Sequence, residues 1–437
     1  MAQIKLIPII EHGSGEELGI TVIEFGDPNS ENKAYIQGSL HGNELMGSVV
    51  ILELAERLAS LESHLNGFIR LVPSCNPVGI ATKVFNAQVG RVNLTDFEDW
   101  NRIFHRLVKK VETEDSFDYE VEVRLPSPEF RERWQLITKI SNEEEITISL
   151  RAFCYHYGTQ NLLEIKQGLE AILLEALTGL HNQRIPYCFS SSELLAFELE
   201  KLSFGADTVI DLHTNSGEGE FYTYFFEWQQ KSLPYLGVSC GLKMLESKSK
   251  ALDECSGQGW SALWRLFNDD EVLCARFPEF YPPSEFWTLE LGSSNDVNPS
   301  SVQCYSDKIM NYLSYRRFIP ERSDALTQHI YVSRENFNSS NIADTRYYAP
   351  CSGFFYPSVK SGTIVEIGQE IGRVLSLSKL KKYANQNEFP EKLNQSLSVK
   401  IYAREKAFVL NMIDSPMVFQ GMTLFTVVED FETWIPT

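Results

Sequence analysis

The sequence contains neither clustered cysteine nor an excess of positive charge. Its eight cysteines are scattered singly along 437 residues, with no CxxC pair. That spacing excludes a compact disulfide framework and favours reduced thiols, mostly buried as small apolar groups. The formal net charge of −20 argues against nucleic acid and anionic membranes as partners. An anionic substrate therefore needs a local cluster of cations.

Long hydrophobic runs are also missing. The N-terminal segment MAQIKLIPIIEHGSGEE has only a short apolar run before Glu11, which is too short for a signal sequence or a membrane span. The sequence has no internal repeat and no low-complexity tract. We therefore expect a soluble, cytoplasmic protein. Hydrophobic residues make up 43% of the chain, enough for a large core, and the length favours two domains.

Strand-like and helix-like segments alternate over the first two-thirds of the chain. Short apolar runs predict strands, and apolar residues at helical spacing predict helices. The predicted strands are 33–40, 68–73, 207–212 and 286–291, and the predicted helices are 45–61 and 194–202. This alternation predicts an α/β layer structure with a largely parallel or mixed sheet.

Two stretches depart from the alternation. Residues 106–150 contain acidic runs and no clear period, which favours an inserted loop or hairpin. From about residue 346 the sequence has glycine every few residues and short alternating strands, which predicts a small all-β domain. The polar segment 320–344 connects the two parts.

The segment Gly38-Ser-Leu-His41-Gly-Asn-Glu44 carries the clearest chemical signal. It follows a predicted strand and precedes a predicted helix, and its His41 and Glu44 are spaced so that both side chains can face one point. His213 ends another predicted strand and supplies a third candidate ligand, as catalytic zinc sites require. Asp211 lies two residues earlier on the same side of that strand, where it can orient the site.

Each of these residues also has a simpler interpretation. His41 can be a loop histidine without a ligand role, and His213 can be a core histidine hydrogen-bonded at a strand end. Glu290 stands in an otherwise apolar strand, where a carboxylate is costly to bury without a partner or a task. It is a candidate general base, with a structural role near the sheet edge as the alternative.

The required cations are found at Asn101-Arg102, Arg91 and Arg276. Arg102 can grip a carboxylate with two parallel hydrogen bonds, and Asn101 adds an amide donor beside it. For Arg91 alone, ordinary surface ion pairing is an alternative. Arg276 lies in a loop rich in Phe, Tyr and Pro and could contact a second carboxylate, with a solvated arginine as the alternative.

Together these motifs resemble the succinylglutamate desuccinylase/aspartoacylase family of the zinc carboxypeptidase superfamily. The resemblance runs in order from about residue 30 to the C-terminus. The motifs that carry it are HGNE at 41–44, Asn76-Pro77, Asn101-Arg102, Asp211-Leu212-His213 and Glu290.

The resemblance implies roles for these residues. One zinc ion would be held by His41, Glu44 and His213, and Glu290 would act as general base and then as acid. The pair Asn101-Arg102 would hold the substrate carboxylate, and Arg91 would help to polarise the scissile carbonyl.

The resemblance also implies the architecture. A carboxypeptidase-like mixed sheet flanked by helices would span residues 1–335, with the insert at 106–150, and a small β domain of barrel-sandwich type would span 345–437. The run Leu375-Ser-Leu-Ser-Lys379 lacks the flanking methionines of a modified lysine, so no lipoyl or biotinyl arm is expected.

Three functions remain in competition. The first is a zinc-dependent deacylase that cleaves a non-peptide amide bond in an N-acyl amino acid or a related small carboxylate. The second is a metallocarboxypeptidase that acts on short peptides. The third, a non-catalytic binding protein, is disfavoured because all the expected ligand and base residues are present. The expected partner is a small carboxylate substrate, and a homo-oligomer is left open.

Overall fold

The structure is a computed structural model. It describes residues 2–11, 13–85, 87–104, 190–215, 221–244, 285–293, 297–320, 323–326, 329–333, 346–381, 383, 391–413 and 415–436. The insert predicted at 106–150 and Arg276 lie outside the described residues.

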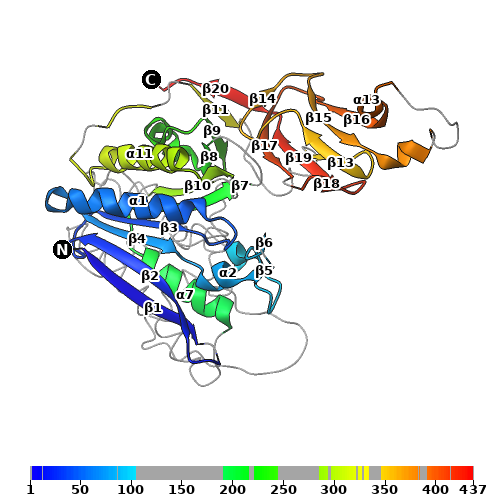
Figure 1. Cartoon of the computed structure of the whole chain (residues 1–437). Helices are drawn as coiled ribbons and strands as arrows, with labels where there is room; N and C mark the ends of the chain where they lie inside the picture. Colours follow the sequence, from blue (N-terminus) through cyan, green and yellow to red (C-terminus); the bar gives the residue numbers. More distant parts are fainter. Residues whose placement is uncertain are drawn as a thin grey trace, which may run out of the picture. The chain divides into compact units, whose positions relative to one another are not determined.

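A ten-stranded sheet forms the largest element (Figure 1). Its strand order is β1-β2-β4-β3-β7-β10-β8-β9-β11-β20. The strands are β1 (Gln3–Glu11), β2 (Glu17–Gly26), β3 (Lys33–Gly38), β4 (Phe68–Ser74), β7 (Thr208–Asn215), β8 (Phe221–Phe225), β9 (Cys240–Lys243), β10 (Glu285–Ser293), β11 (Ile330–Ser333) and β20 (Phe431–Trp434). Strand pairs β3–β4 and β8–β9 are parallel, whereas β1–β2 and β8–β10 are antiparallel. The prediction of a mixed α/β sheet is therefore confirmed.

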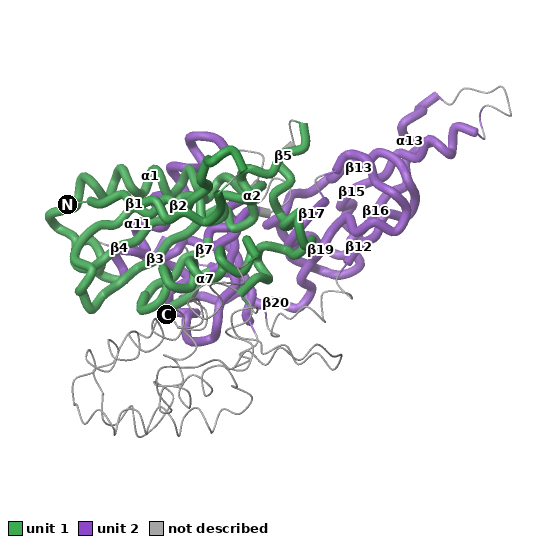
Figure 2. The backbone as a smooth tube through the Cα atoms, turned by 90° about the horizontal axis from the view of Figure 1, so that it is seen from below, with its two compact units in different colours: residues 1–211, 246–287, 316–321 green, residues 212–245, 288–315, 322–437 purple. Residues whose placement is uncertain are grey.

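The chain divides into two compact units (Figure 2). Unit 1 comprises residues 1–211, 246–287 and 316–321, and unit 2 comprises residues 212–245, 288–315 and 322–437. The domains expected from the sequence, a catalytic domain over 1–335 and a β domain over 345–437, follow other boundaries. That domain division stays a prediction.

In unit 1, two helices cover the strands. Helix α1 (Met46–Ser60) lies against β3 and β4 and buries one apolar face, which includes Val50 and Leu54. Helix α7 (Ser191–Ser203) begins with a capping box formed by Ser190 and Glu193. Its Leu195 and Leu199 enter a core cluster built with side chains of β2, β3 and β4. Strands covered in this way read as the continuous apolar runs seen in the sequence.

In unit 2, helix α11 (Pro299–Tyr315) packs against the short helix α8 (Leu233–Leu236). The rings of Tyr235 and Tyr315 stack with centroids 3.8 Å apart, and Asn311 Nδ2 donates to the Tyr235 carbonyl at 2.7 Å. Within the described residues, no helix combines the length and the apolarity needed to cross a bilayer.

The C-terminal part of unit 2 contains two four-stranded sheets. One has the order β12-β19-β17-β14 and the other β16-β15-β13-β18. Their bounds are β12 (Arg346–Tyr348), β13 (Gly353–Pro357), β14 (Ile364–Val365), β15 (Glu370–Leu375), β16 (Ser398–Tyr402), β17 (Ala407–Met412), β18 (Met417–Val418) and β19 (Thr423–Val428).

Alternating side chains of both sheets form one apolar core, with Phe355 and Ile371 from one sheet and Val409 and Phe425 from the other. Two details depart from a purely β domain. A short helix, α13 (Leu393–Leu397), precedes β16, and the last strand, β20, belongs to the large sheet. The barrel-sandwich type stays a prediction.

Candidate metal centre

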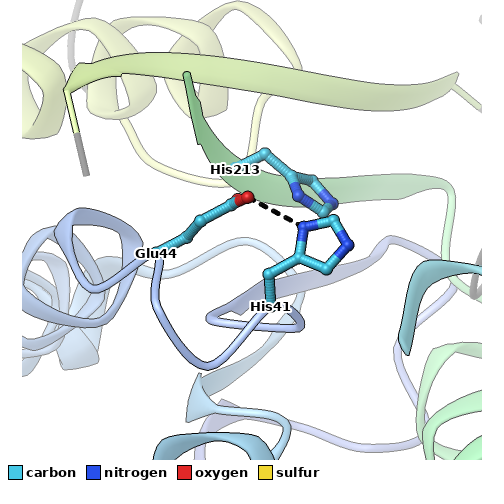
Figure 3. Close-up of side chains that lie close together, drawn as sticks. All are labelled: His41, Glu44 and His213. Carbon is cyan, nitrogen blue, oxygen red and sulfur yellow. Dashed lines mark hydrogen bonds and ion pairs between the residues drawn. The ribbon is translucent and has the colours of Figure 1, made fainter. Parts of the chain in front are cut away.

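Three predicted ligands lie together. One ligand atom from each of His41, Glu44 and His213 falls within 4.8 Å of the others, and all three residues are buried. Figure 3 shows the side chains pointing toward one another, with His41 and Glu44 on the loop after β3 and His213 on β7. Two imidazoles and one carboxylate are a common ligand set for zinc.

The loop that carries His41 is held in an unusual conformation. Ser39 has a positive φ of 60°, which is uncommon for a residue with a side chain. Its hydroxyl donates to the Glu44 carbonyl at 2.8 Å, and it also lies 2.6 Å from the Ser48 hydroxyl. This turn reverses the chain between β3 and α1, and so brings His41 and Glu44 to one point.

The same loop packs directly against the backbone of two other segments, and each of the three contacts is made by a glycine. A Cβ atom on Gly42 would lie 2.0 Å from the Gly79 carbonyl carbon, and one on Gly90 would lie 1.9 Å from the Gly79 oxygen. The Gly42 N–H donates to the Gly90 carbonyl at 2.7 Å. Only glycine allows three backbone segments to approach so closely. These glycines therefore fix the position of the loop that carries His41 and Glu44.

Asn76 of the predicted Asn-Pro turn adds a further tie. Its side-chain amide donates to the Leu40 carbonyl at 2.7 Å, and its oxygen accepts from the Gly79 N–H at 2.8 Å. It thereby caps helix α2 (Pro77–Ala81) and anchors the residue before His41. Asn76 therefore supports the site by holding the backbone of the loop that carries His41.

The hydrogen bonding of His41 tests whether the cluster suits a cation. Its Nε2 lies 2.9 Å from Asp99 Oδ1, and its Nδ1 lies 2.8 Å from Glu44 Oε1. A neutral imidazole has one N–H, so it can donate to only one of these carboxylates. If Nε2–H donates to Asp99, the Nδ1 lone pair and the Glu44 oxygen face each other, an arrangement that a shared cation stabilises. The residues therefore fit a metal ion.

Asp99 is the site residue that the sequence reasoning missed. It lies in the loop before the 3-10 helix η2 (Trp100–Arg102), where its Oδ1 also accepts from the Asn101 N–H at 2.9 Å. Burial acts to raise the pKa of Asp99, but the hydrogen bond and charge of His41, the Asn101 N–H and Arg91 lower it to about 2. A carboxylate two residues before Asn101-Arg102 was the available signal.

Arg91 contacts the carboxylates around His41. Its NH1 lies 3.3 Å from Glu44 Oε1, and its Nε lies 3.3 Å from Asp99 Oδ2. The side chain is 57% exposed, so one side of the guanidinium also reaches solvent. The structure thus places Arg91 at the predicted centre, ion-paired with a ligand and with the residue that supports a ligand.

The Asn101-Arg102 pair follows directly after Asp99. Arg102 is exposed, and its NH1 donates to the Asn101 carbonyl at 2.8 Å. The Asn101 side-chain oxygen is buried and has no hydrogen-bond partner among the described residues. The bond from the Asn101 N–H to Asp99 ties this pair to the network around His41.

Asp211 lies on β7, two residues before His213. It is fully buried, and its charge is among the influences that raise the pKa of the Tyr35 phenol and the Cys75 thiol, after burial itself. The carboxylate in contact with the ring of His41 is that of Asp99. The predicted role of Asp211 beside His213 stays a prediction.

Glu290 lies on β10, which neighbours β7 in the sheet. It is partly exposed and is paired with Tyr222 of β8 in the antiparallel register, so both side chains lie on one face of the sheet. Burial and then the charge of Glu290 raise the pKa of Tyr222 well above its usual range. Tyr222 also packs against Phe408 of β17, with ring centroids 6.3 Å apart.

Comparison with solved structures shows the same fold. A protein assigned to succinylglutamate desuccinylase/aspartoacylase from Shewanella frigidimarina NCIMB 400 is 20% identical, with a TM-score of 0.72 over 99% of this chain and 98% of that chain. A family protein from Shewanella amazonensis SB2B is also 20% identical, with a TM-score of 0.70 over 99% and 100% of the two chains. The product-bound ectoine utilization protein EutE (DoeB) from Ruegeria pomeroyi is 13% identical, with a TM-score of 0.55 over 98% and 94%.

The sequence comparison agrees with the fold. Residues 30–124 match the family model of the succinylglutamate desuccinylase/aspartoacylase catalytic domain, a stretch that contains His41, Glu44 and the Asn101-Arg102 pair. No curated protein matches the chain.

The fold and the buried His-Glu-His cluster define a mixed α/β protein with a candidate metal centre of hydrolase type. The resemblance noted from the sequence is confirmed by the match of residues 30–124 to the family model and by the shared fold. The match over residues 30–124 supports a hydrolase of deacylase type.

Proposed function

We propose that the protein is a zinc-dependent deacylase that hydrolyses an amide bond in an N-acyl amino acid or a related carboxylate-bearing small molecule. The observation that carries the proposal is the convergence of His41, Glu44 and His213 on one buried point. The product-bound relative is described as an ectoine utilization protein, so small-molecule substrates are in keeping with the fold. The protein would hold one zinc ion per chain.

Zinc bound by these three residues would supply a Lewis acid that polarises the substrate carbonyl and lowers the pKa of a water molecule. Glu290 would accept a proton from the attacking water and then deliver it to the leaving nitrogen. The reaction consumes one water and yields a carboxylate and an amine. Asp99 would keep the His41 ring in one orientation throughout, through the 2.9 Å contact at Nε2.

Substrate binding would depend on cations in an acidic chain. Arg102, with Asn101 beside it, would hold the substrate carboxylate through paired hydrogen bonds. Arg91 would stabilise negative charge that develops on the carbonyl oxygen, since its guanidinium already lies beside Glu44. Arg276 remains a candidate for a second carboxylate.

Two measurements test this function together. Elemental analysis of protein purified without chelators should give about one zinc per chain. A panel that pairs N-acyl amino acids with dipeptides of matched side chains should show turnover of the N-acyl compounds. Preferential turnover of the dipeptides would replace the deacylase with a carboxypeptidase. Absence of metal would contradict a metalloenzyme of either kind and would favour the alternative of a non-catalytic binding protein.

A further inference from the structure

Figure 1 shows the strands of the sheet β16-β15-β13-β18. Its outer face carries exposed apolar and cationic side chains. Phe355 and Val418 point into the core between the two sheets, so their neighbours along β13 and β18 point outward. We call the outward set the β13 face; its members are Phe354, Tyr356, Arg373, Leu375, Lys400 and Met417.

One row across the β13 face is apolar. Phe354 stands directly opposite Met417 on one side and Leu375 on the other. Phe354 is 39% exposed and Met417 is 54% exposed. Neighbouring exposed apolar side chains of this kind are a candidate binding surface.

The next row of the β13 face is cationic. Tyr356 stands opposite Arg373, and Arg373 stands opposite Lys400. Two like charges directly opposite each other destabilise a sheet. Lys400 pairs with Glu370 at 2.7 Å, whereas Arg373 has no carboxylate partner among the described residues. Tyr, Phe, Met and Arg are the residue types that protein interfaces favour.

The hairpin of β1 and β2 has the opposite charge. Its last cross-strand pair joins Glu11 to Glu17, two exposed carboxylates, with Glu16 next to them in the turn. Strand β1 is an edge of the large sheet and exposes Ile4 and Leu6 by 75% and 61%. An exposed apolar edge strand needs a cover, because its open backbone and apolar side chains favour association.

The net charge of the chain is distributed unevenly between the C-terminal segment, which contains the β13 face, and the remaining residues. Residues 346–437 contain ten Lys and Arg and nine Asp and Glu, a net charge of +1. The rest of the chain therefore carries −21, since the total is −20. The C-terminal segment is the part of the molecule that an acidic surface does not repel.

The two surfaces also match in length. Leu6 and Glu11 are five residues apart on one strand, or about 17 Å at the usual strand rise. Met417 and Lys400 are three strand spacings and two residues apart, or about 16 Å. An apolar group and a charged group are therefore separated by similar distances on both surfaces, with charges of opposite sign.

We propose that the β13 face binds the β1–β2 hairpin of a second copy of this chain. Ile4 and Leu6 of one copy cover Phe354 and Met417 of the other. The Glu11–Glu17 pair then lies against the Arg373–Lys400 row, and each like-charged pair gains opposite charges. The proposal is independent of the proposed enzymatic function.

Charge reversal tests the pairing directly. Sedimentation velocity at micromolar concentration should show the wild type above its monomer mass of 49.9 kDa. Arg373→Glu with Lys400→Glu, or Glu11→Lys with Glu17→Lys, should each weaken association at least about tenfold. The variant with all four changes should regain association, because the charges are complementary again. Lys406→Glu, in an exposed ion pair with Glu366 and not a member of the β13 face, is the matched control and should leave association unchanged.

Several results would overturn the proposal. One is a monomeric wild type, and another is a four-fold variant that stays monomeric while its melting temperature equals that of the wild type. If only the Arg373–Lys400 reversal disrupts association, and that variant then binds wild type, two β13 faces meet each other instead. If only the hairpin reversal disrupts it, two β1 edges pair.

Discussion

Nε2 of His41 lies 2.9 Å from Oδ1 of Asp99, so a carboxylate supports the histidine on the side away from Glu44. Such an outer carboxylate fixes the ring and the tautomer of a ligand histidine. Loss of the Asp99 carboxylate should therefore lower metal affinity more than it lowers the stability of the fold.

Replacing Asp99 by alanine should weaken zinc binding about 10- to 100-fold. Competition with a chromophoric chelator measures this affinity directly. Asp99→Asn should lose less, because an amide oxygen can still accept from Nε2–H. Glu405→Gln removes an exposed carboxylate and serves as the control. Unchanged zinc affinity in Asp99→Ala would show that the contact with His41 has no supporting role.

Replacing Glu290 by glutamine should separate metal binding from chemistry. The amide keeps the size of the side chain but cannot take a proton, so kcat should fall by about 10²- to 10⁴-fold while zinc content stays at wild-type level. The pKa of Tyr222 should also fall, because the charge of Glu290 helps to raise it. Ultraviolet titration of tyrosine gives this second readout, and full activity would remove Glu290 from the mechanism.

Arg102 should affect substrate binding more than chemistry. Loss of a paired carboxylate contact in Arg102→Ala should raise KM, and Arg102→Lys should recover little, because lysine cannot form two parallel hydrogen bonds. Arg91→Lys provides the comparison. If Arg91 stabilises charge on the carbonyl, that variant should lower kcat instead. Equal effects of the two variants on KM alone would remove the distinction between their roles.

Much of the fold could be predicted from the sequence, because buried strands and amphipathic helices leave strong periodic signals. The run predicted as a strand at 33–40 is β3 (Lys33–Gly38), and the helix predicted at 45–61 is α1 (Met46–Ser60). The last strand, β20, was not predicted to join the large sheet. Its four residues pair with β11, a long-range contact that local periodicity does not encode.

The convergence of the three candidate ligands could also be predicted, because His41 and Glu44 share one short motif and His213 directly follows an apolar run. The network around them could not. Asp99 reaches His41 across 58 positions of sequence, and the Gly42, Gly79 and Gly90 contact depends on three separate backbone segments. Side-chain networks of this kind are set by the tertiary fold.

Glu24 should make stability depend on acidity. Its carboxylate, 8% exposed, pairs with Lys5 and lies 2.9 Å from Arg70 Nε. Burial acts to raise the pKa of Glu24, but Lys5 and Arg70 together lower it below its usual 4.5. A lowered folded-state pKa gives stability that is fully present above the unfolded pKa and is lost as pH falls through the folded pKa.

Glu24→Gln should therefore cost about 1–3 kcal/mol of unfolding free energy at neutral pH. The difference from wild type should shrink as pH falls below about 4.5. Denaturant unfolding across this pH range measures it. Glu366→Gln breaks an exposed pair with Lys406 and should cost less than about 1 kcal/mol at any pH. A Glu24 effect that does not change with pH would mean that packing, not charge, causes it.

The close contact between Gly42 and the Gly79 backbone should make position 42 intolerant of any side chain. Any side chain on Gly42 would collide with Gly79 backbone at 2.0 Å, and backbone cannot move aside as a flexible side chain does. Gly42→Ala should therefore cost about 1–3 kcal/mol or more and displace His41, lowering zinc affinity in proportion to the shift. Gly13→Ala is the matched control, since a Cβ there meets nothing within 4 Å. Thermal unfolding with and without zinc separates the two effects. If Gly42→Ala lowers stability equally in both, the contact supports the fold but not the ligand loop. If zinc stabilises the variant less than the wild type, the loss falls on the metal centre, because stabilisation by a ligand rises with its affinity.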